Sequence, residues 1–275
     1  MRARSNLLRI AGAVLVAFAA FLLLMFGFQD QLVFPTHAVA EPGPLPVGAT
    51  RVTIPAADGN ELHGVHVAPV SPVQGSRTLI IGFAGNAWNS EDAATYLHDI
   101  YPAADIVVFH YRGYRPSTGK PSAEALLEDA PLVYDFAVAK LRPDRSIAVG
   151  FSIGSGIAAG LAAERPVDGV ILVTPFDSLK AVAKSLYPFL PVGTVFRHDM
   201  DAAAALADSK VPTAIVAAER DTIIPPQRTE ALRTAVGNLV FDRTIAGAAH
   251  NDIYDRPEFR AAMHGALDAV SRTGG

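Results

Sequence analysis

The feature that most constrains the fold is a succession of short, almost uninterrupted apolar runs, separated by stretches of helical periodicity. The six runs are residues 78–83, 105–109, 146–151, 169–173, 213–218 and 239–245. Strands buried on both faces of a sheet have this composition. Ahead of them, two alternating segments at 51–55 and 61–68 flank the turn Asp58-Gly59, which predicts an antiparallel hairpin. The sequence therefore predicts an eight-stranded, mostly parallel sheet.

Helical periodicity occurs in most of the intervals between these runs and in the stretch after the last one. It is clearest at residues 122–140, 153–163, 226–235 and 257–270, and an alanine-rich patch at 202–205 is typical of helix filler. Strands that alternate with helices indicate an α/β fold with helices on both faces of the sheet. Half of the 275 residues are hydrophobic and 18% are charged, which excludes a disordered chain.

The N-terminal region contains a long run, residues 10–28, without charge or proline. As a helix it would be about 28 Å long, close to the roughly 30 Å of a hydrocarbon core. Asp30 follows the run, and three arginines precede it: Arg2, Arg4 and Arg9. The excess of positive charge before the run predicts a single-pass anchor, with a cytoplasmic N-terminus and the remaining chain on the extracytoplasmic side.

A cleaved secretory signal is the alternative for this region, because residues 38–40 read Ala-Val-Ala, a small-residue cleavage pattern. The protein would then be secreted. The apolar run is, however, longer than a typical signal core and ends well before that site. We therefore divide the chain into a cytoplasmic start and anchor (1–30), a proline- and glycine-rich tether (31–48) and a catalytic domain (49–275).

Charge and cysteine content exclude several classes of function. The net charge is −4, with no basic cluster beyond the N-terminus, which argues against nucleic acid as a partner. The chain has no cysteine, so disulfides, thiolate metal sites and a cysteine nucleophile are excluded. His63 and His66 lack a carboxylate-rich partner set for a metal. We expect neither cofactor nor metal, and no protein partner can be identified.

A candidate nucleophile lies where one buried strand gives way to a helix. Residues 150–154 read Gly-Phe-Ser-Ile-Gly, a G-x-S-x-G pattern, between the run 146–151 and the helical stretch 153–163. In this context the serine is held in a strained turn with its hydroxyl above the sheet, and small neighbours allow strand and helix to approach. The alternative is a purely structural role, as an ordinary glycine-rich turn between strand and helix. Ser152 is the candidate nucleophile.

An activated serine needs a base, and the base needs an acid to orient it. His250 follows the last strand in a small-residue loop at the carboxyl edge, where such sheets bind ligands. The other histidines considered fit less well; they are His37, His63, His66 and His110. Asp221, after the run 213–218, gives the chain order Ser, acid, His that this architecture uses. Asp177, after the run 169–173, is its rival.

The negative charge on a tetrahedral intermediate requires backbone N–H donors. The residue after the nucleophile, Ile153, supplies one, and the glycine-rich loop 82–89 after the third strand supplies the other. Asn86 is the favoured donor in that loop, and Ala87 is the alternative.

Five motifs in order resemble the small α/β-hydrolases that carry an N-terminal membrane anchor, which include bacterial members and relatives of eukaryotic protein depalmitoylases. They are residues 29–35, 85–89, 111–122, 174–179 and 247–252. The resemblance covers nearly the whole chain. It implies an α/β-hydrolase fold with a short cap over residues 179–210, and hence an exposed acyl substrate.

The sequence departs from the family pattern in three places. Ala84 replaces the histidine of the oxyanion loop, Trp88 replaces its second glycine, and Ala217-Ala218 stands where His-Gly often precedes the acid. The first two could change oxyanion geometry or substrate access. None removes a member of the expected triad.

The sequence favours hydrolysis of a carboxylic ester or thioester through an acyl-enzyme on Ser152, with His250 then activating water. Amide or peptide cleavage by the same residues is one alternative. The other is an inactive, membrane-tethered binding module, supported only by Ala84 and Trp88. The expected partners are an acyl substrate and, through residues 10–28, a lipid bilayer. Apolar residues that could line an acyl pocket, or belong to the core, are Phe83, Trp88, Leu186, Tyr187, Phe189 and Phe196.

Overall fold

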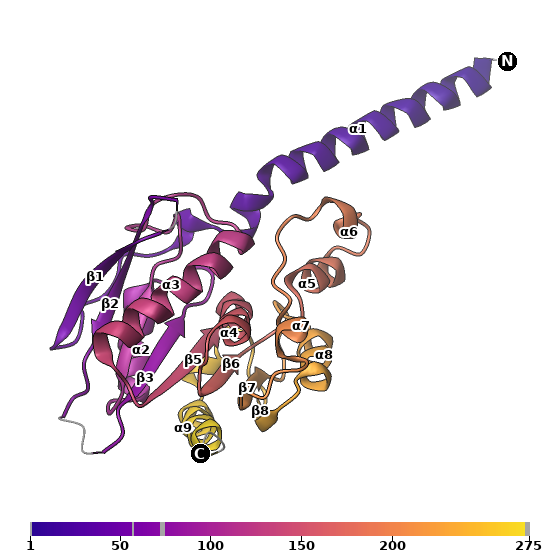
Figure 1. The fold of residues 1–275 in the computed structure, drawn as a ribbon. Helices are drawn as coiled ribbons and strands as arrows, with labels where there is room; N and C mark the ends of the chain where they lie inside the picture. The colour runs from indigo at the N-terminus through magenta and orange to yellow at the C-terminus, as the bar shows by residue number, and fades with distance from the viewer. Residues whose placement is uncertain (1, 57, 72–74, 273–275) are drawn as a thin grey trace.

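The computed structural model describes residues 2–56, 58–71 and 75–272. Its centre is one eight-stranded sheet with the strand order β1-β2-β4-β3-β5-β6-β7-β8 (Figure 1). The strands are β1 (Ala49–Pro55), β2 (Glu61–Val67), β3 (Thr78–Phe83), β4 (Asp105–Phe109), β5 (Arg145–Phe151), β6 (Gly169–Val173), β7 (Thr213–Ala218) and β8 (Leu239–Ile245).

The sheet is parallel except at β2, which runs antiparallel to both of its neighbours, β1 and β4. The predicted eight-stranded, mostly parallel sheet is therefore confirmed, and every predicted strand begins and ends within two residues of the observed one. The pairing of Phe83 with Gly150, and of Phe151 with Val173, brings the carboxyl ends of β3, β5 and β6 side by side. The loops after these strands consequently meet at one edge.

Helices cover both faces of the sheet, as two separate apolar clusters of buried residues show. Helices α2 and α9 pack on one face, and α3, α4, α7 and α8 pack on the other. The described helices are α1 (Arg2–Val33), α2 (Ser90–Ile100), α3 (Ala123–Leu141), α4 (Ile153–Glu164), α5 (Leu179–Leu186), α6 (Val192–Val195), α7 (Ala202–Leu206), α8 (Pro226–Ala235) and α9 (Pro257–Arg272), with two short 3₁₀ helices, η1 (Thr36–Ala38) and η2 (Ile253–Asp255).

Helix α1 stands clear of the rest of the molecule, with its N-terminus far from the sheet (Figure 1). Among the described residues it is the one helix long and apolar enough to span a membrane, judged by length and composition, and its most apolar stretch is not buried. It therefore fits a membrane anchor. The side chains of Arg2 and Arg4, which set the expected orientation, lie outside the described part, so the orientation stays a prediction.

The segment after α1 packs against the sheet domain. Phe34 is 2% exposed and belongs to the apolar cluster that also contains α3 and α4. The Asn89 amide donates to the Ala40 carbonyl (3.0 Å), and the Gly43 N–H donates to Asp92 Oδ1 (2.8 Å). Residues 31–48, predicted as a tether, are thus in contact with the domain at several points. The division at residues 30 and 48 stays a proposal.

Candidate active site

Ser152 occupies a tight turn between β5 and α4. Its φ of 52° lies in the left-handed region, a strained conformation for a residue with a side chain. The turn leaves no room beside it: a Cβ on Gly150 would lie 2.3 Å from the Gly154 carbonyl oxygen, and a Cβ on Gly154 would lie 2.2 Å from that of Phe83. Both glycines are therefore required for β5, α4 and the end of β3 to approach, and Ser152 is left partly exposed at the carboxyl edge.

The structure brings Ser152, His250 and Asp221 into one hydrogen-bonded series. His250 Nε2 lies 2.9 Å from Ser152 Oγ, and His250 Nδ1 lies 2.7 Å from Asp221 Oδ2. The other oxygen of Asp221 accepts from the N–H groups of Ile223 (2.9 Å) and Ile224 (2.7 Å). A carboxylate can only accept from Nδ1–H, which leaves Nε2 as the acceptor for the serine hydroxyl. In this arrangement the serine proton can pass to the imidazole.

Asp177, the rival acid, makes different contacts. Its Oδ2 lies 3.1 Å from Arg228 Nη1, and its N–H donates to the Arg228 carbonyl (3.2 Å). The geometry therefore favours Asp221 as the partner of His250. Of the other histidines, His66 pairs with Asp105 (2.7 Å), and burial lowers the pKa of His110 to about 4.

The loop after β3 passes directly beside Ser152, since a Cβ on Gly85 would lie 3.9 Å from Ser152 Cβ. Two side-chain bonds hold Asn86: its amide donates to the Val33 carbonyl at the end of α1 (2.5 Å), and it accepts from the Tyr114 hydroxyl (2.6 Å). Among described residues, the N–H groups of Ile153, Asn86 and Ala87 have no acceptor. The N–H groups of both candidate donors in the loop, Asn86 and Ala87, are therefore free to bind an oxyanion.

The two departures in this loop have clear structural roles. Ala84 is buried, and its carbonyl accepts from the Tyr111 hydroxyl (2.7 Å). The Trp88 ring packs against Phe151, the residue before Ser152 (5.2 Å between ring centroids), and against Tyr254, just beyond His250 (5.3 Å). Through these two ring contacts, Trp88 links the serine turn to the histidine loop. Burial also raises the pKa of Tyr254.

The histidine loop is held by contacts that the sequence reasoning missed. Asp252 Oδ1 accepts from the Ala249 N–H (2.8 Å), and Arg256 bonds both Asp252 Oδ2 (2.7 Å) and the Gly247 carbonyl (3.1 Å). The Arg256 guanidinium holds the pKa of Asp252 below its ordinary value. The one sequence signal for this arrangement is the four-residue spacing of Asp252 and Arg256.

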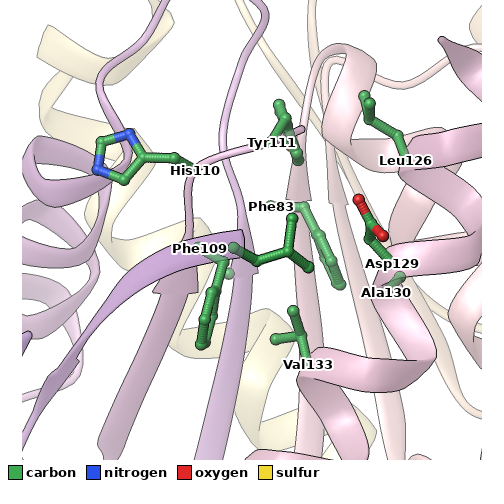
Figure 2. Close-up of a pocket in the computed structure, with 10 residues that line it drawn as sticks. Phe83, Phe109, His110, Tyr111, Leu126, Asp129, Ala130 and Val133 are labelled. Atoms are coloured by element: carbon green, nitrogen blue, oxygen red, sulfur yellow. The ribbon is translucent and has the colours of Figure 1, made fainter. Parts of the chain in front are cut away.

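Figure 2 shows a small cavity between the sheet and α3, and Ser152 is not among its lining residues. Its volume of about 20 Å³ is that of roughly one water molecule. Phe83, Phe109 and Asp129 are among its lining residues, and the His110 ring points away from the others in the view. It is a packing gap and too small for an acyl chain. In the described part of the chain, no cluster of three His, Asp or Glu side chains could hold a metal ion.

The strained serine turn at the carboxyl edge of a mostly parallel eight-stranded sheet defines an α/β-hydrolase, and the chain belongs to that superfamily. Residues 79–205 match the family described as alpha/beta hydrolase fold.

Three curated relatives illustrate the range of similarity. The chain is 27% identical over 255 residues to the uncharacterized protein Rv2307c of Mycobacterium tuberculosis, covering 90% of each chain. It is 30% identical over 208 residues to the uncharacterized protein YfhR of Salmonella typhimurium, covering 69% of this chain and 70% of the relative. It is also 30% identical over 175 residues to the lysophosphatidylserine lipase ABHD12 of Danio rerio, covering 56% of this chain and 46% of the lipase.

Solved structures share the fold at low sequence identity. An alpha-beta hydrolase from Vibrio vulnificus matches with a TM-score of 0.68 and 17% identity, covering 90% of this chain and 92% of that one. The Pyrococcus furiosus esterase Pf2001 matches with a TM-score of 0.63 and 17% identity, covering 86% and 98%. The chain therefore has a hydrolase fold, and its relatives include proteins named as a lipase and an esterase.

Proposed function

We propose that this protein is a serine hydrolase that cleaves carboxylic esters or thioesters, with Ser152 as nucleophile, His250 as base and Asp221 as the acid that orients it. The observation that carries the proposal is the hydrogen-bonded series from Ser152 Oγ through both nitrogens of His250 to Asp221. The lipase and esterase among its relatives support the same class of substrate.

The reaction follows from the positions of these atoms. Ser152 Oγ attacks the acyl carbon while its proton moves to His250 Nε2, and Asp221 stabilises the resulting imidazolium. The N–H groups of Ile153 and of Asn86 or Ala87 donate to the oxyanion. Collapse breaks the bond to the alcohol or thiol, which leaves with the proton from His250. Water, deprotonated by His250, then attacks the acyl-enzyme, and the carboxylic acid is released as Ser152 regains its proton.

The backbone contacts of Asp221 prepare it for this role. Because Oδ1 is occupied by the N–H groups of Ile223 and Ile224, Oδ2 is directed at His250 without a change of rotamer. Burial of Asp221 and His250 keeps bulk water from competing for these bonds.

We further propose that α1 anchors the protein in a membrane, with a cytoplasmic N-terminus and the catalytic domain on the other side. The uncharged, unburied stretch 10–28 of α1 supports the anchor, and the arginines ahead of residue 10 support the orientation.

The first test is a fluorophosphonate probe on the full chain in detergent, with the adduct located by mass spectrometry. We expect labelling at Ser152 that is lost in both Ser152→Ala and His250→Ala. Ser185→Ala, which changes an exposed serine, is the matched control and should keep the label. A folded wild-type chain that takes no label at Ser152 would refute the proposal. Matched ester, thioester and amide substrates then identify the bond that is cleaved.

A further inference from the structure

The cap carries a run of exposed apolar side chains. Of the cap expected over residues 179–210, the part next to α1 is residues 178–198, which include α5 and α6. From here on "cap" means these residues, and "cap tip" means residues 186–191, Leu-Tyr-Pro-Phe-Leu-Pro. Leu186, Tyr187 and Phe189 are all exposed, and Phe189 is 94% exposed. Single exposed apolar residues are ordinary on a protein surface, but several together indicate a surface that another apolar phase covers.

Direct contacts fasten the cap to the end of α1. Gln29 donates to the Val195 carbonyl (3.2 Å) and accepts from the Arg197 N–H (2.8 Å). The Arg197 guanidinium lies over the Phe26 ring, 4.7 Å from its centroid, and also bonds Asp30 Oδ1 (2.9 Å). These contacts fix how far along α1 the cap sits.

That position coincides with the expected boundary of the bilayer. The uncharged run of α1 ends at Phe28, and at 1.5 Å per residue Phe26 lies about 3 Å inside that end. Arg197, beside Phe26, is therefore at the membrane–water interface, where arginine and aromatic side chains are favoured. Figure 1 shows α5 and α6 at the end of the molecule from which α1 departs.

The charge of the cap matches the same surface. Residues 178–198 contain Lys180, Lys184, Arg197 and His198 and neither Asp nor Glu, in a chain of net charge −4. Lys180 pairs with Asp199, just beyond this range, and Arg197 and His198 pair with Asp30, so within the described residues Lys184 is the basic side chain of this range without an acidic partner. Basic side chains next to a membrane helix are attracted to anionic headgroups. A second copy of this chain, with its net negative charge, would not explain why apolar and basic residues gather at this level of α1.

We propose that the cap tip is a second membrane contact: Leu186, Tyr187 and Phe189 enter the boundary between headgroups and acyl chains of the bilayer that α1 spans, while Lys184 and Arg197 lie among the lipid phosphates. The inference rests on the proposed anchor. Ser152 lies at the carboxyl edge of the sheet, beside the loop that contacts the end of α1 through Asn86, so it is on the side of the domain that the proposed membrane contact faces.

The absence of cysteine from the sequence makes a site-specific test direct. A single cysteine at Phe189→Cys carries an environment-sensitive fluorophore in the full chain, reconstituted in phosphatidylcholine vesicles with and without phosphatidylglycerol. We expect blue-shifted emission and strong quenching by lipids with a quencher on the upper acyl chain, both greater when phosphatidylglycerol is present.

Two further positions serve as controls. Val70→Cys is also exposed but follows β2 at the opposite edge of the sheet, and it should behave as in water. Val16→Cys, on α1, should be quenched if the anchor spans the bilayer. A label at residue 189 that matches residue 70, while residue 16 is quenched, overturns the cap contact and leaves the anchor standing. Emission that changes with protein density and not with the lipid quencher assigns the cap tip to a second copy and also overturns it.

Turnover measurements test whether the membrane contact of the cap tip brings a lipid substrate to Ser152. This part of the inference rests on the proposed function. Tyr187→Ser with Phe189→Ser should lower hydrolysis of a long-chain ester embedded in vesicles several-fold and leave a short, water-soluble ester unaffected. Equal rates of wild type and variant on the embedded ester would overturn this role. If wild type cleaved neither ester, the proposed function would fail, while the fluorescence would still decide the membrane contact.

Discussion

At the carboxyl edge of the sheet, the candidate catalytic residues stand on turns that directly follow paired strands, so the backbone ladder fixes their positions. At the junction between α1 and the cap, position depends on side-chain contacts between segments 166 to 171 residues apart, such as Gln29 with Val195 and Arg197 with Phe26. The first region holds the residues proposed to carry out the chemistry. The second sets how the proposed membrane helix is placed relative to them, and the two meet at Asn86.

The largest expected effect concerns the acid at the edge. Asp221→Asn should lower kcat about 10⁴-fold, because an amide no longer holds His250 in the tautomer that accepts the serine proton. Asp177→Asn is the matched control, and turnover should stay within a few-fold of wild type. Steady-state kinetics with equal melting temperatures checks this. A larger loss in Asp177→Asn would transfer the role to Asp177 and break the geometric assignment.

At the junction, the largest effect is on stability. Phe34→Ala should lower the free energy of unfolding by about 3–5 kcal/mol, as truncation of a buried phenylalanine usually does. Leu32→Ala, two residues earlier and 61% exposed, should change little. Urea unfolding of the full chain in detergent measures both. Equal effects would mean that the segment after α1 does not belong to the core.

A buried histidine at the edge predicts a pH dependence of stability. The pKa of His110 is about 4 in the folded protein, against 6.5 for a free histidine, because burial disfavours the charged ring. The unfolded chain therefore binds this proton first, and stability present above pH 6.5 falls as the pH drops toward 4. At about 1.4 kcal/mol per pKa unit, the loss reaches up to about 3 kcal/mol.

His110→Asn should flatten the fall between pH 6.5 and 4 in urea unfolding curves. His37→Asn, at an exposed position, is the control and should leave the curve as in wild type. If the free energy of unfolding of His110→Asn falls between pH 6.5 and 4 as steeply as that of wild type, then His110 is not the cause of the fall, and this part of the carboxyl edge opens to water.

The smallest effect tests the coupling of the two regions. Asn86→Ala keeps the backbone N–H but removes the side-chain bonds to Val33 and Tyr114. We expect kcat to fall about tenfold with KM unchanged, less than the 10²–10³ lost when an oxyanion donor is removed outright. Asn238 is distant from the site, and its amide donates to the Lys210 carbonyl. Asn238→Ala should therefore leave kcat and KM unchanged. An unchanged kcat in Asn86→Ala would mean that the contact between Asn86 and the end of α1 does not affect turnover.

The strands could be predicted closely because burial on both faces leaves an uninterrupted apolar run, as in β3, β4 and β6. Helix α2 was missed. Its buried face includes the small Ala93 and Ala94 and the polar Ser90, Glu91 and His98, which weaken the apolar periodicity. The helix was therefore hidden by composition rather than by length.

Of the candidate site, Ser152, Asp221 and His250 could be chosen from the order of elements, because each follows a strand at the same edge. Contacts between distant segments could not. Nothing in the spacing of Gln29 and Arg197 indicates that they form a hydrogen bond. The sequence marks Trp88 only as a departure from a motif, and its packing on Phe151 is evident only in the folded structure.

The direct contacts of Gln29 and Asp30 with the cap leave the catalytic domain fastened to α1 rather than suspended from it. A membrane helix adapts to a thinner bilayer by tilting. In this protein a tilt of α1 would turn the whole domain with it, lowering one side of the cap toward the lipid and lifting the other. If α1 is the anchor proposed above, bilayer thickness would then set the angle at which Ser152 meets the membrane surface, and the proposed hydrolysis would depend on the membrane that α1 spans.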